Sequence, residues 1–546
     1  MKRTWGILLG LLVVGAPVAV RAQFTYSTNG GVITLASYTG SGGAVVISNF
    51  VNSIGSNAFL GKSTLTSVTI PGSVTNIGAE AFYECSGLTS VTIPGSVTNI
   101  GNYAFGYCDA LTNAVISNGV TGIGADAFFF CPKLASVTIP GNITDFATVF
   151  ADCSNLTTVM IASGVTSIVS DAFQFCTTLT SVTIPGSVTS IGAEAFLECA
   201  GLTSITIPGS VTNIGADALG DCASLTAITV DNTNLFYSSV NGVLFDKSQK
   251  TLIQYPLHRA GGNYEIPGSV TSIWDAFAGC ATLTNVMIGN SVTNIGADAF
   301  WGCLSLISVA IPASVTSIGA DAFYGCSSLT SVTIPGSVTN FGEWAFASCT
   351  MLTNATICNG VSNLNNYAFA SCSDLTSVTI PGSVTSIGAD AFYWCSNLTS
   401  VTIPGSVTSI GENAFTDCRI LNSVCFEGNA PPQSTNVFEY ANNAKVYYLP
   451  GTTGWSNTFA GVPTAFWVLP NPMILNNEPS MGVQSNGFGF MISWATNLSV
   501  VVEACTNLGN PVWVPVWTNG LTGGCCCFSD LEWTNYPGRF YRITTP

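Results

Sequence analysis

The sequence has few charged residues and almost no histidine. Asp, Glu, Lys and Arg together make up 7% of the 546 residues, and His258 is the single histidine. Zinc sites need close pairs of cysteine or additional histidines, and the chain has no such motif. It also lacks a glycine-rich phosphate loop and a nucleophile elbow. The sequence therefore predicts no enzyme, no metal and no cofactor, and leaves only a hydrolase built on paired carboxylates as an enzymatic alternative.

Basic residues are especially scarce. The chain carries 12 Lys and Arg against 28 Asp and Glu, which gives a net charge of −16. The electrostatic field of such a negative net charge repels nucleic acid and anionic lipid, so we expect no nucleic-acid partner. Ser, Thr, Asn and Gly are abundant instead. A surface of hydroxyls and amides suits contact with a protein or a glycan better than ionic steering.

The first 22 residues have the pattern of an export signal. Lys2 and Arg3 precede an apolar run over 5–20 that Pro17 interrupts, and Val20-Arg21-Ala22 ends in small residues. We expect cleavage after Ala22, which removes three basic residues and changes the net charge to −19. The alternative is an uncleaved membrane anchor, for which the run is short. No second run of spanning length follows, so the sequence predicts a secreted or cell-surface protein without a transmembrane segment after cleavage.

A repeat of 23 residues occupies most of the chain. Its cysteines lie at 85, 108, 131, 153, 176, 199 and 222, and then at 280, 303, 326, 349, 372, 395 and 418. All steps are 23 residues except one of 22 and one of 58. A fixed period in this range, with apolar residues at fixed positions, predicts a repeat solenoid whose coils bury apolar residues by stacking.

The cysteine spacing argues against a disulfide framework. Residues at one position of successive coils stack at the strand spacing of about 4.8 Å with their side chains parallel, whereas a disulfide needs the Cβ atoms turned toward each other. We therefore predict a column of buried free thiols. Outside this column, Cys525, Cys526 and Cys527 are candidates for a link to Cys505 or for free reactive thiols.

Each repeat contains two apolar stretches and a turn. In the copy that begins at Cys326, Leu329, Val332 and Ile334 should point inward from a short strand, and Pro335 should end it. We expect the later pair Ala345-Phe346 to form a short helical piece. An acid often precedes this pair and would cap the helical piece. The alternative is a row of carboxylates that binds Ca²⁺.

The repeat resembles the BspA-like leucine-rich repeats of bacterial surface proteins. The resemblance rests on Leu-Thr-Ser-Val-Thr-Ile-Pro-Gly-Ser-Val-Thr-Ser-Ile-Gly-Ala-Asp-Ala-Phe at 375–392, which recurs at 398–415 and 179–196, and it covers roughly 45–425. It implies a right-handed leucine-rich-repeat coil with a parallel sheet on one face. It also implies an exported adhesion or interaction protein without enzymatic activity in the array.

Ser and Thr fill the strand positions that should face outward, such as Ser90, Thr92, Ser331 and Thr333. The strand face is then a lattice of hydroxyls, which could suit a repetitive ligand such as a polysaccharide or a crystal surface. The alternative is that Thr occurs here only because it favours strands.

The 58-residue step contains an insertion, 231–263. We interpret it as a β-hairpin turned at 246–250 that projects from one face, or as a tolerated insertion whose aromatic residues pack on the rod. Its basic and aromatic side chains form a candidate recognition patch: Phe236, Tyr237, Lys247, Lys250, Tyr255, His258 and Arg259. Trp274, Trp301, Trp344 and Trp394 occupy irregular repeat positions and are weaker candidates.

The sequence thus divides into five parts. We predict a signal peptide (1–22), an N-terminal cap (23–50), the repeat array (51–425), a C-terminal cap (426–470) and a small β-sandwich (471–546). The last part resembles a short C-terminal domain of exported proteins of environmental bacteria, through its ending Trp-Thr-Asn-Tyr-Pro-Gly-Arg-Phe-Tyr-Arg at 533–542. Its tryptophans could stack on sugars or form its core.

Together these observations predict an exported, non-enzymatic interaction or adhesion protein. Its ligand would be a protein or polysaccharide outside the cell, bound by the array or the insertion. The alternatives are an architectural component of the envelope or matrix, and a protein that binds a crystalline surface through its Ser/Thr columns.

Overall fold

The structure is a computed structural model that describes residues 23–143, 148–467, 473–475, 482–484, 487–493, 499–520, 525–530, 532–536 and 538–544. The predicted signal segment lies outside these residues. The chain divides into two compact units: residues 1–261 with 275–282, and residues 262–274 with 283–546. The division falls beside the insertion that the sequence places at 231–263.

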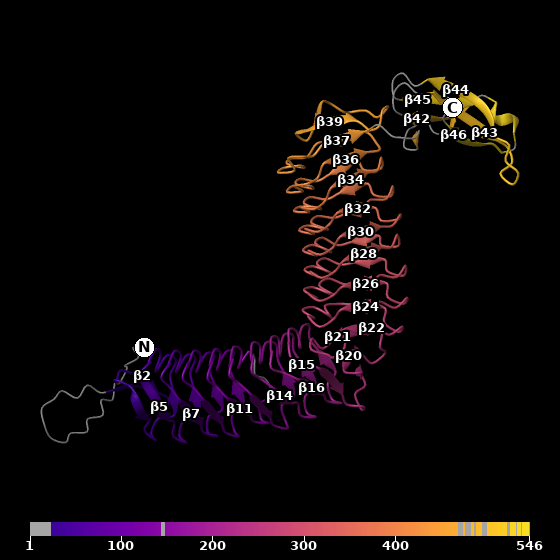
Figure 1. The fold of residues 1–546 in the computed structure, drawn as a ribbon. Coiled ribbons are helices and arrows are strands. Elements are labelled where there is room, and N and C mark those ends of the chain that lie inside the picture. The colour runs from indigo at the N-terminus through magenta and orange to yellow at the C-terminus, as the bar shows by residue number, and fades with distance from the viewer. Residues whose placement is uncertain are drawn as a thin grey trace. The chain divides into compact units, whose positions relative to one another are not determined.

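Unit 1 is a stack of coils, and each coil contributes one longer strand to a parallel sheet (Figure 1). These strands are β3 (Gly43–Val46), β5 (Leu65–Thr69), β7 (Ser90–Ile93), β9 (Asn113–Ile116), β11 (Ser136–Ile139), β12 (Thr158–Ile161) and β14 (Ser181–Thr183), followed by the pair β16 (Ser204–Ile207) and β18 (Ala227–Val230).

A second ladder of two-residue strands runs along another side of unit 1. It contains β4 (Ser53–Ile54), β6 (Asn76–Ile77), β8 (Asn99–Ile100), β10 (Gly122–Ile123), β13 (Ser167–Ile168), β15 (Ser190–Ile191) and β17 (Asn213–Ile214). At its first edge, β1 (Phe24–Asn29) and β2 (Val32–Tyr38) form an antiparallel pair, and β2 joins β4 in parallel. The insertion adds β19 (Tyr237–Val240), β20 (Val243–Asp246) and β21 (Thr251–Gln254).

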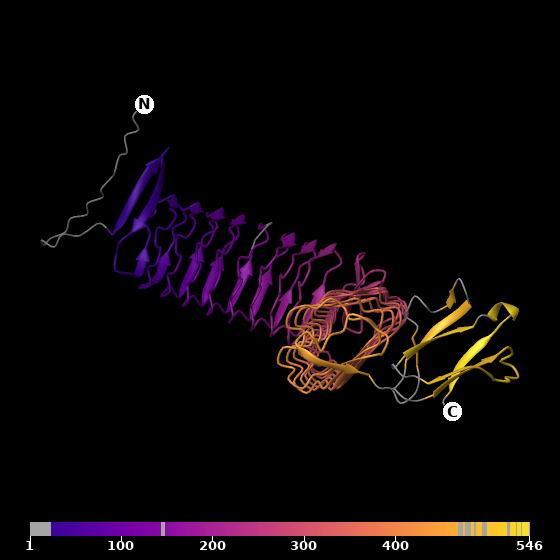
Figure 2. The same cartoon turned by 90° about the horizontal axis from the view of Figure 1, so that it is seen from above.

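Unit 2 repeats this plan, and Figure 2 shows its coils end-on as nearly superposed rings. Its longer strands are β22 (Asn263–Glu265), β24 (Asn285–Met287), β26 (Ser308–Ala310), β28 (Ser331–Ile334), β30 (Asn354–Ile357) and β32 (Ser377–Thr379), then β34 (Ser400–Ile403), β36 (Ser423–Phe426), β37 (Val446–Tyr448) and β39 (Val462–Phe466). The two-residue β38 (Thr458–Phe459) pairs antiparallel with β39. Its two-residue strands are β23 (Ser272–Ile273), β25 (Asn294–Ile295), β27 (Ser317–Ile318), β29 (Asn340–Phe341), β31 (Asn363–Leu364), β33 (Ser386–Ile387) and β35 (Ser409–Ile410).

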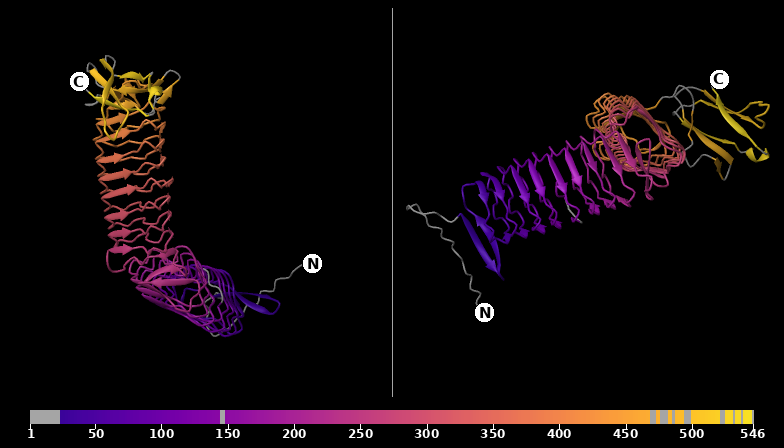
Figure 3. Two further views of the ribbon diagram at one scale, coloured as in Figure 1. Left: turned by 90° about the vertical axis from the view of Figure 1, so that its right-hand side faces the viewer. Right: turned by 90° about the horizontal axis from the view of Figure 1, so that it is seen from below.

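The repeat period sets the strand register. In β28 and β30, Val332 pairs with Ala355 and Ile334 pairs with Ile357, an offset of 23 residues. Residues at equivalent repeat positions therefore form columns that run from coil to coil, as the aligned strands in Figure 3 show. The coils approach closely beside these ladders. A Cβ on Gly101 would lie 2.4 Å from the amide nitrogen of Ala79, so glycine is needed there.

A column of phenylalanine rings fills the interior of each unit. In unit 2, Phe346 stacks between Phe323 and Phe369, with ring centroids 4.8 and 5.7 Å away. In unit 1, Phe82 stacks on Phe59 at 4.8 Å and on Phe105 at 5.0 Å. These rings are fully buried. The predicted solenoid with a continuous stacked core is confirmed.

The turn around each Ala-Phe pair is not helical, contrary to the expectation from the sequence. Glu80 and Glu84, on either side of Phe82, have φ of +56°, the left-handed region. A helix cap and a helical turn both require other angles, so the capping role of the acids is wrong. Instead, the amides of Glu80 and Phe82 donate to carbonyls of the next coil at 2.8 and 2.7 Å. The one helix in the described part of the chain is the 3-10 helix η1 (Trp533–Asn535).

The cysteine column consists of free thiols, as predicted. None of the 17 cysteines whose side chains the structure describes forms a disulfide, and the 14 of the repeat column are buried. Each thiol of the regular coils donates to a phenylalanine carbonyl of the preceding coil, as Cys372 does to Phe346 at 3.1 Å. The thiols therefore link each coil to the preceding one at carbonyls most of which also accept a cysteine amide of their own coil, as the Phe369 carbonyl does from Cys372.

Many hydroxyls add further hydrogen bonds between coils, often to a carbonyl that also accepts the backbone amide of the same residue, as the Thr75 carbonyl does from Thr98. Thr98 donates to the carbonyl of Thr75 at 3.1 Å, and Thr121 donates to that of Thr98 at 3.0 Å. Ser96 of the Pro-Gly-Ser turn donates to the carbonyl of Val74 at 2.8 Å. These side chains link neighbouring coils, a role that the sequence analysis did not assign to them.

The C-terminal residues form two small antiparallel sheets. One contains β40 (Met473–Leu475), β41 (Gly482–Gln484), β42 (Gly487–Ser493) and β45 (Cys525–Asp530), and the other contains β43 (Ser499–Cys505), β44 (Val514–Gly520) and β46 (Phe540–Thr544). Phe490, Ile492 and Phe528 of the first sheet share a buried core with Val500 and Val502 of the second. The predicted small β-sandwich is therefore confirmed.

Replacing a ring in the middle of the phenylalanine column should destabilise unit 2 strongly. We expect Phe346→Ala to lower the free energy of unfolding by about 3–5 kcal/mol, because a cavity replaces two stacked contacts. Urea unfolding followed by circular dichroism measures the effect. The half-exposed Phe236 provides a control, and Phe236→Ala should change stability by less than about 0.5 kcal/mol. Equal effects of the two changes would contradict the interior column.

The buried thiols should make the array sensitive to alkali. Burial raises the pKa of Cys372 and of Cys418 to about 12. Unfolding exposes these thiols and returns their pKa to about 8.5. Above that pH the unfolded state holds fewer protons than the folded state, so stability falls by about 1.4 kcal/mol per pH unit for each such thiol until pH 12. Urea midpoints measured between pH 8 and pH 11 test this slope.

Substitution separates the thiols from other groups that titrate in this range. The double change Cys372→Ala and Cys418→Ala should make the decline less steep, because it removes two thiols whose pKa burial raises to about 12. An unchanged slope in the double variant would show that the buried thiols do not govern alkaline stability.

Candidate functional site

The strand face carries the predicted hydroxyl lattice. Ser90 and Thr92 of β7 are exposed on either side of the buried Val91, and β28 repeats the pattern. Larger apolar side chains interrupt the lattice at exposed positions of β9, β12 and β24: Val115, Met160 and Met287. The face is therefore a set of short hydroxyl patches rather than one uniform surface.

The insertion packs into unit 1 and does not project from it. β19 and β20 form a hairpin, and β20 pairs with β21 across the turn at 246–250 that the sequence predicted. Val243, Leu244 and Phe245 of β20 are fully buried. The insertion therefore contributes to the interior of unit 1, in agreement with the alternative interpretation that its aromatic residues pack on the rod.

A buried asparagine organises the start of the insertion. Asn234 is fully buried, and its amide group donates to the carbonyls of Pro208 and Val211 at 2.8 and 2.9 Å. Its side-chain oxygen accepts from the amides of Phe236 and Tyr237, both at 2.8 Å. The Lys247 ammonium donates to its backbone carbonyl. Three of the seven candidate residues are thus brought together around Asn234.

Within this group, the side chains differ in accessibility. Phe236 is 49% exposed beside Leu235, which is 76% exposed. Tyr237 is half-buried, and its hydroxyl accepts from the amide of Ile214 at 2.9 Å. Burial raises the pKa of Tyr237. Only Phe236 and the exposed Lys247 present much surface to a ligand here, while Lys250 is exposed at the turn of the hairpin.

Tyr255 is a core residue and is not accessible to a ligand. It is fully buried, its ring lies 5.0 Å from that of Phe277, and its amide donates to the carbonyl of Ala276 at 2.8 Å. These are the contacts that phenylalanine makes in regular coils. The Arg259 guanidinium lies 5.6 Å from the Tyr255 ring and donates to the carbonyl of Asn241 at 3.2 Å. Tyr255 and Arg259 thus form a second, separate part of the predicted patch.

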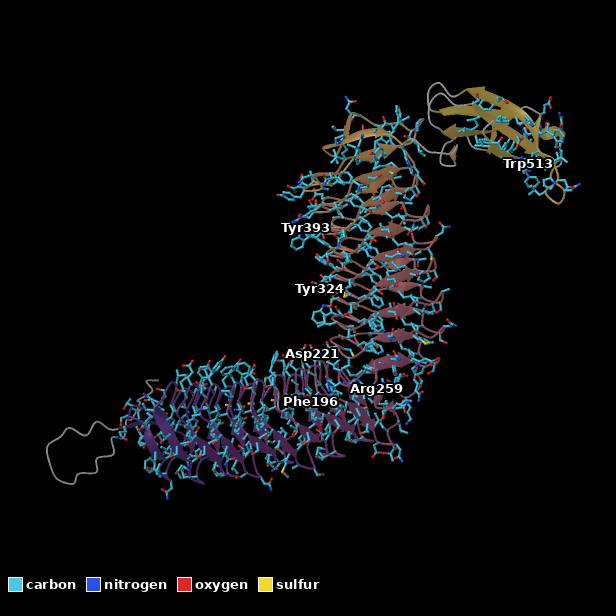
Figure 4. The ribbon with its side chains drawn as sticks, viewed as in Figure 1. Phe196, Asp221, Arg259, Tyr324, Tyr393 and Trp513 are labelled. Atoms are coloured by element: carbon cyan, nitrogen blue, oxygen red, sulfur yellow. The ribbon has the colours of Figure 1, made fainter. Side chains whose placement is uncertain are left out.

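His258 lies in another place, a hollow of about 380 Å³ in unit 1 that Glu198, Asp221 and Thr282 also line. Burial raises the pKa of Asp221, and the Asp217 carboxylate raises it further. Figure 4 labels Asp221 among these side chains. Among the described residues, no group of three or more His, Cys, Asp or Glu side chains could hold a metal ion. The seven candidate residues therefore do not form one site.

The aromatic residues at the turn edge of unit 2 form a more extended surface. Five successive coils contribute to this turn-edge row, which consists of Trp301, Tyr324, Trp344, Tyr367, Tyr393 and Trp394. Trp344 and Tyr367 stack face to face, with centroids 3.8 Å apart and an interplanar angle of 5°. Figure 4 shows Tyr324 and Tyr393 on the same edge of the unit. From the sequence alone, the tryptophans of this row, Trp301, Trp344 and Trp394, are only weaker candidates for recognition.

The most open members of the row are Trp301 and Trp394, which are 42% and 49% exposed. Trp394 borders a hollow of about 520 Å³. We call this feature the Trp394 hollow, and its lining residues are Ser348, Thr350, Ser371, Ser373, Trp394, Ser396 and Arg419. The Arg419 side chain is largely exposed, and its Nε donates to the Asp417 carboxylate at 3.1 Å.

Repeat columns explain the shape of this hollow. Ser348, Ser371 and Trp394 occupy one column, and Thr350, Ser373, Ser396 and Arg419 occupy another. The earlier coils contribute small side chains to the lining, and later coils contribute the two large ones, Trp394 and Arg419. The abrupt change of side-chain size within each column, at Trp394 and at Arg419, can be seen in the sequence and is the signal of this hollow that the sequence contains.

The C-terminal sandwich uses its tryptophans in different ways. Trp517 packs against the shared core of the two sheets. The Arg542 guanidinium lies 4.6 Å from the Trp513 ring and pairs with Glu503 at 2.7 Å. Trp494 lies outside the described residues. The sandwich therefore offers one half-buried, cation-bound indole at Trp513, which Figure 4 labels.

Substitutions at Tyr255 should affect stability and leave ligand binding alone. We expect Tyr255→Ala to lower the free energy of unfolding by about 3–5 kcal/mol, because it opens a cavity beside Phe277. Tyr255→Phe keeps the ring and should cost about 1 kcal/mol or less. Urea unfolding measures both. Loss of ligand binding in a stably folded Tyr255→Phe variant would restore Tyr255 as a recognition residue.

Comparisons with known proteins agree with this architecture. The family model described as a BspA type leucine rich repeat region matches residues 37–149, 147–256, 262–376 and 362–462. A leucine rich cell surface protein from Faecalibacterium prausnitzii is 30% identical over 76% of this chain and 96% of its own, with a TM-score of 0.48. A leucine-rich repeat protein from Bacteroides ovatus is 28% identical over 71% of this chain and 94% of its own, also with a TM-score of 0.48. No curated protein matches the sequence. The chain belongs to the BspA-type leucine-rich repeat family.

Proposed function

We propose that this protein is an exported, non-enzymatic binding protein that attaches to a protein or polysaccharide outside the cell. The observation that carries the proposal is the contrast between its interior and its surface. Phenylalanine, leucine and cysteine columns fill the coils, while hydroxyl patches and an aromatic row occupy the exterior. A long scaffold that displays repeated polar and aromatic groups is suited to recognition rather than to chemistry.

The composition of the site regions supports the absence of catalysis. His258 lies beside the carboxylates of Glu198 and Asp221 in a small hollow. The family and fold of the chain are those of leucine-rich repeat proteins, which typically act by binding other molecules. An enzymatic role would require groups with tuned proton affinity around a substrate cleft.

Export rests on the N-terminal sequence pattern at 1–22 and on the nature of related proteins. The F. prausnitzii relative is described as a cell surface protein. None of the described residues belongs to a helix long and apolar enough to cross a membrane. A mature chain of 23–546 would then act outside the cell.

Binding of the mature chain to extracellular material tests this function. Residues 23–546, immobilised on a sensor, should bind at least one ligand saturably from a panel of matrix proteins and polysaccharides. Placing Lys at Ser331 and Thr333 in the hydroxyl lattice, or Ala at Trp394, should weaken binding if the array is the recognition surface. Trp513→Ala in the sandwich is the matched control. Absence of any saturable ligand would contradict the proposal and favour an architectural role.

A further inference from the structure

We propose that the Trp394 hollow is a binding site for a neutral glycan, whose sugar ring stacks on the Trp394 indole while Arg419 and the surrounding hydroxyls bind its hydroxyl groups. This inference rests on the proposed binding function and names the ligand class and the place where it binds. It uses residues of unit 2 alone.

The indole of Trp394 is available as a stacking platform. The residue one coil earlier in its column is Ser371, which cannot cover an indole face, whereas Trp344 is covered by Tyr367 in the next coil. The one ring contact of Trp394 among the described residues is with Tyr393, at 6.0 Å and an interplanar angle of 32°. Half of its surface therefore remains open to a ligand that has an apolar face.

The column that holds Trp394 varies in side-chain size from coil to coil. Its residues are left-handed in other coils too, with φ of +58° at Ser371 and +56° at Tyr107, so the fold sets this backbone angle and leaves the side chain free to vary. Gly302 and Gly325 occupy the column in earlier coils. In the coil of Trp394 the variable side chain is an indole that stands 49% exposed.

The hollow also supplies both kinds of hydrogen-bonding group that a sugar needs. Thr350, Ser373 and Ser396 donate their hydroxyl hydrogens to backbone carbonyls of the preceding coils at 3.2–3.3 Å, so their oxygens remain as acceptors. Arg419 uses Nε to bind Asp417, which fixes the guanidinium and leaves its two terminal nitrogens as donors. Acceptors and donors thus line one cavity from the same repeat column, next to the column that carries the indole.

The charge around the hollow favours a neutral ligand. Asp417 already pairs with Arg419, and Asp374 lies beside Ser373 in the chain. The whole chain carries a net charge of −16. An acidic glycan or a nucleotide would meet this field without an unpaired cation to balance it. A neutral sugar needs only the hydroxyl and guanidinium groups.

The size of the hollow fits a small ligand better than a folded partner. Its volume of about 520 Å³ falls within the 300–1,000 Å³ typical of small-molecule sites. A stable protein interface buries about 1,200 Å² or more and does not depend on one such cavity. Short segments of a polysaccharide therefore match the dimensions and the chemistry of the site.

Titration with defined oligosaccharides tests the inference. The probes are maltohexaose, cellohexaose, mannohexaose and xylohexaose, with sialyllactose as a charged comparison, and the protein is the mature chain 23–546. Calorimetry and the fluorescence of tryptophan measure binding. We expect at least one neutral hexaose to bind saturably and sialyllactose to bind at least tenfold more weakly.

Two variants act on the platform in opposite ways. Trp394→Ala removes the indole and should weaken binding about tenfold or more. Ser371→Trp adds a second indole below it, and Ser371 has φ of +58°, nearly the φ of Trp394, so the same backbone accepts tryptophan. The added ring should cover the platform and fill the hollow, and it should also weaken binding about tenfold. The matched control is Trp301→Ala, which removes an exposed tryptophan of the same edge outside the hollow and should leave affinity unchanged.

The outcomes separate this inference from the proposed function. Saturable binding with the expected order of variants supports it. Binding of a matrix protein without binding of any neutral hexaose overturns the glycan site and leaves the binding function intact. Hexaose binding that Trp394→Ala and Trp301→Ala weaken equally, or that neither weakens, overturns the assignment to this hollow. Absence of every ligand overturns both. Unchanged urea midpoints confirm that the variants are folded.

Discussion

Parallel hydrogen bonding between consecutive coils is the constraint on which the structure depends. Each coil must place its amides opposite the carbonyls of the next along two strand ladders and along the Ala-Phe turn. The turn meets this requirement with two left-handed residues per coil, such as Glu80 and Glu84. Because the register is fixed, every side chain faces its equivalents in the neighbouring coils. Columns of identical residues are then the simplest way to fill the interior.

The same constraint explains why so many polar side chains are structural. A coil with only short strands makes few ladder hydrogen bonds to its neighbour, and each carbonyl can accept a second hydrogen bond. Cysteine thiols, threonine hydroxyls and turn serines donate to carbonyls of the preceding coil, as in Cys372, Thr98 and Ser96. The protein therefore uses its uncharged polar residues to hold coils together. The side chains left over on the strand face and at the turn edge, together with the acceptor oxygens of the coil-linking hydroxyls, are available to recognise a ligand.

Much of the fold follows from the sequence because a period assigns each residue to a column. Leu329, Val332 and Phe346 were identifiable as interior residues, and the cysteines as a thiol column, without coordinates. The prediction of the turn was wrong for two reasons. An acid before Ala-Phe resembles a helix cap. In addition, residue type does not reveal the positive φ, because Glu, Trp and Tyr all occupy this position in different coils.

The candidate site was less predictable for a different reason. The insertion breaks the period, so nothing in the sequence shows that Tyr255 takes the place of a core phenylalanine. The Trp394 hollow depends on two columns that are adjacent in space, and their proximity appears only when the coil is folded. Each column change, from Ser371 to Trp394 and from Ser396 to Arg419, is visible in the sequence. The sequence does not show that these two columns meet at one cavity.

The fixed hydrogen-bond register also bears on how such a chain can change over evolutionary time. An in-frame duplication or loss of one whole repeat shifts every later residue by one coil. Each residue then still lies opposite a residue of the same repeat position. Such a change alters the number of coils without creating a buried mismatch, whereas a shift of a few residues would place polar groups in the phenylalanine column. Recombination between similar repeats in the gene can therefore lengthen or shorten the array almost freely. A side chain that departs from its column, such as Trp394, is then the kind of residue that copying of repeats would tend to erase.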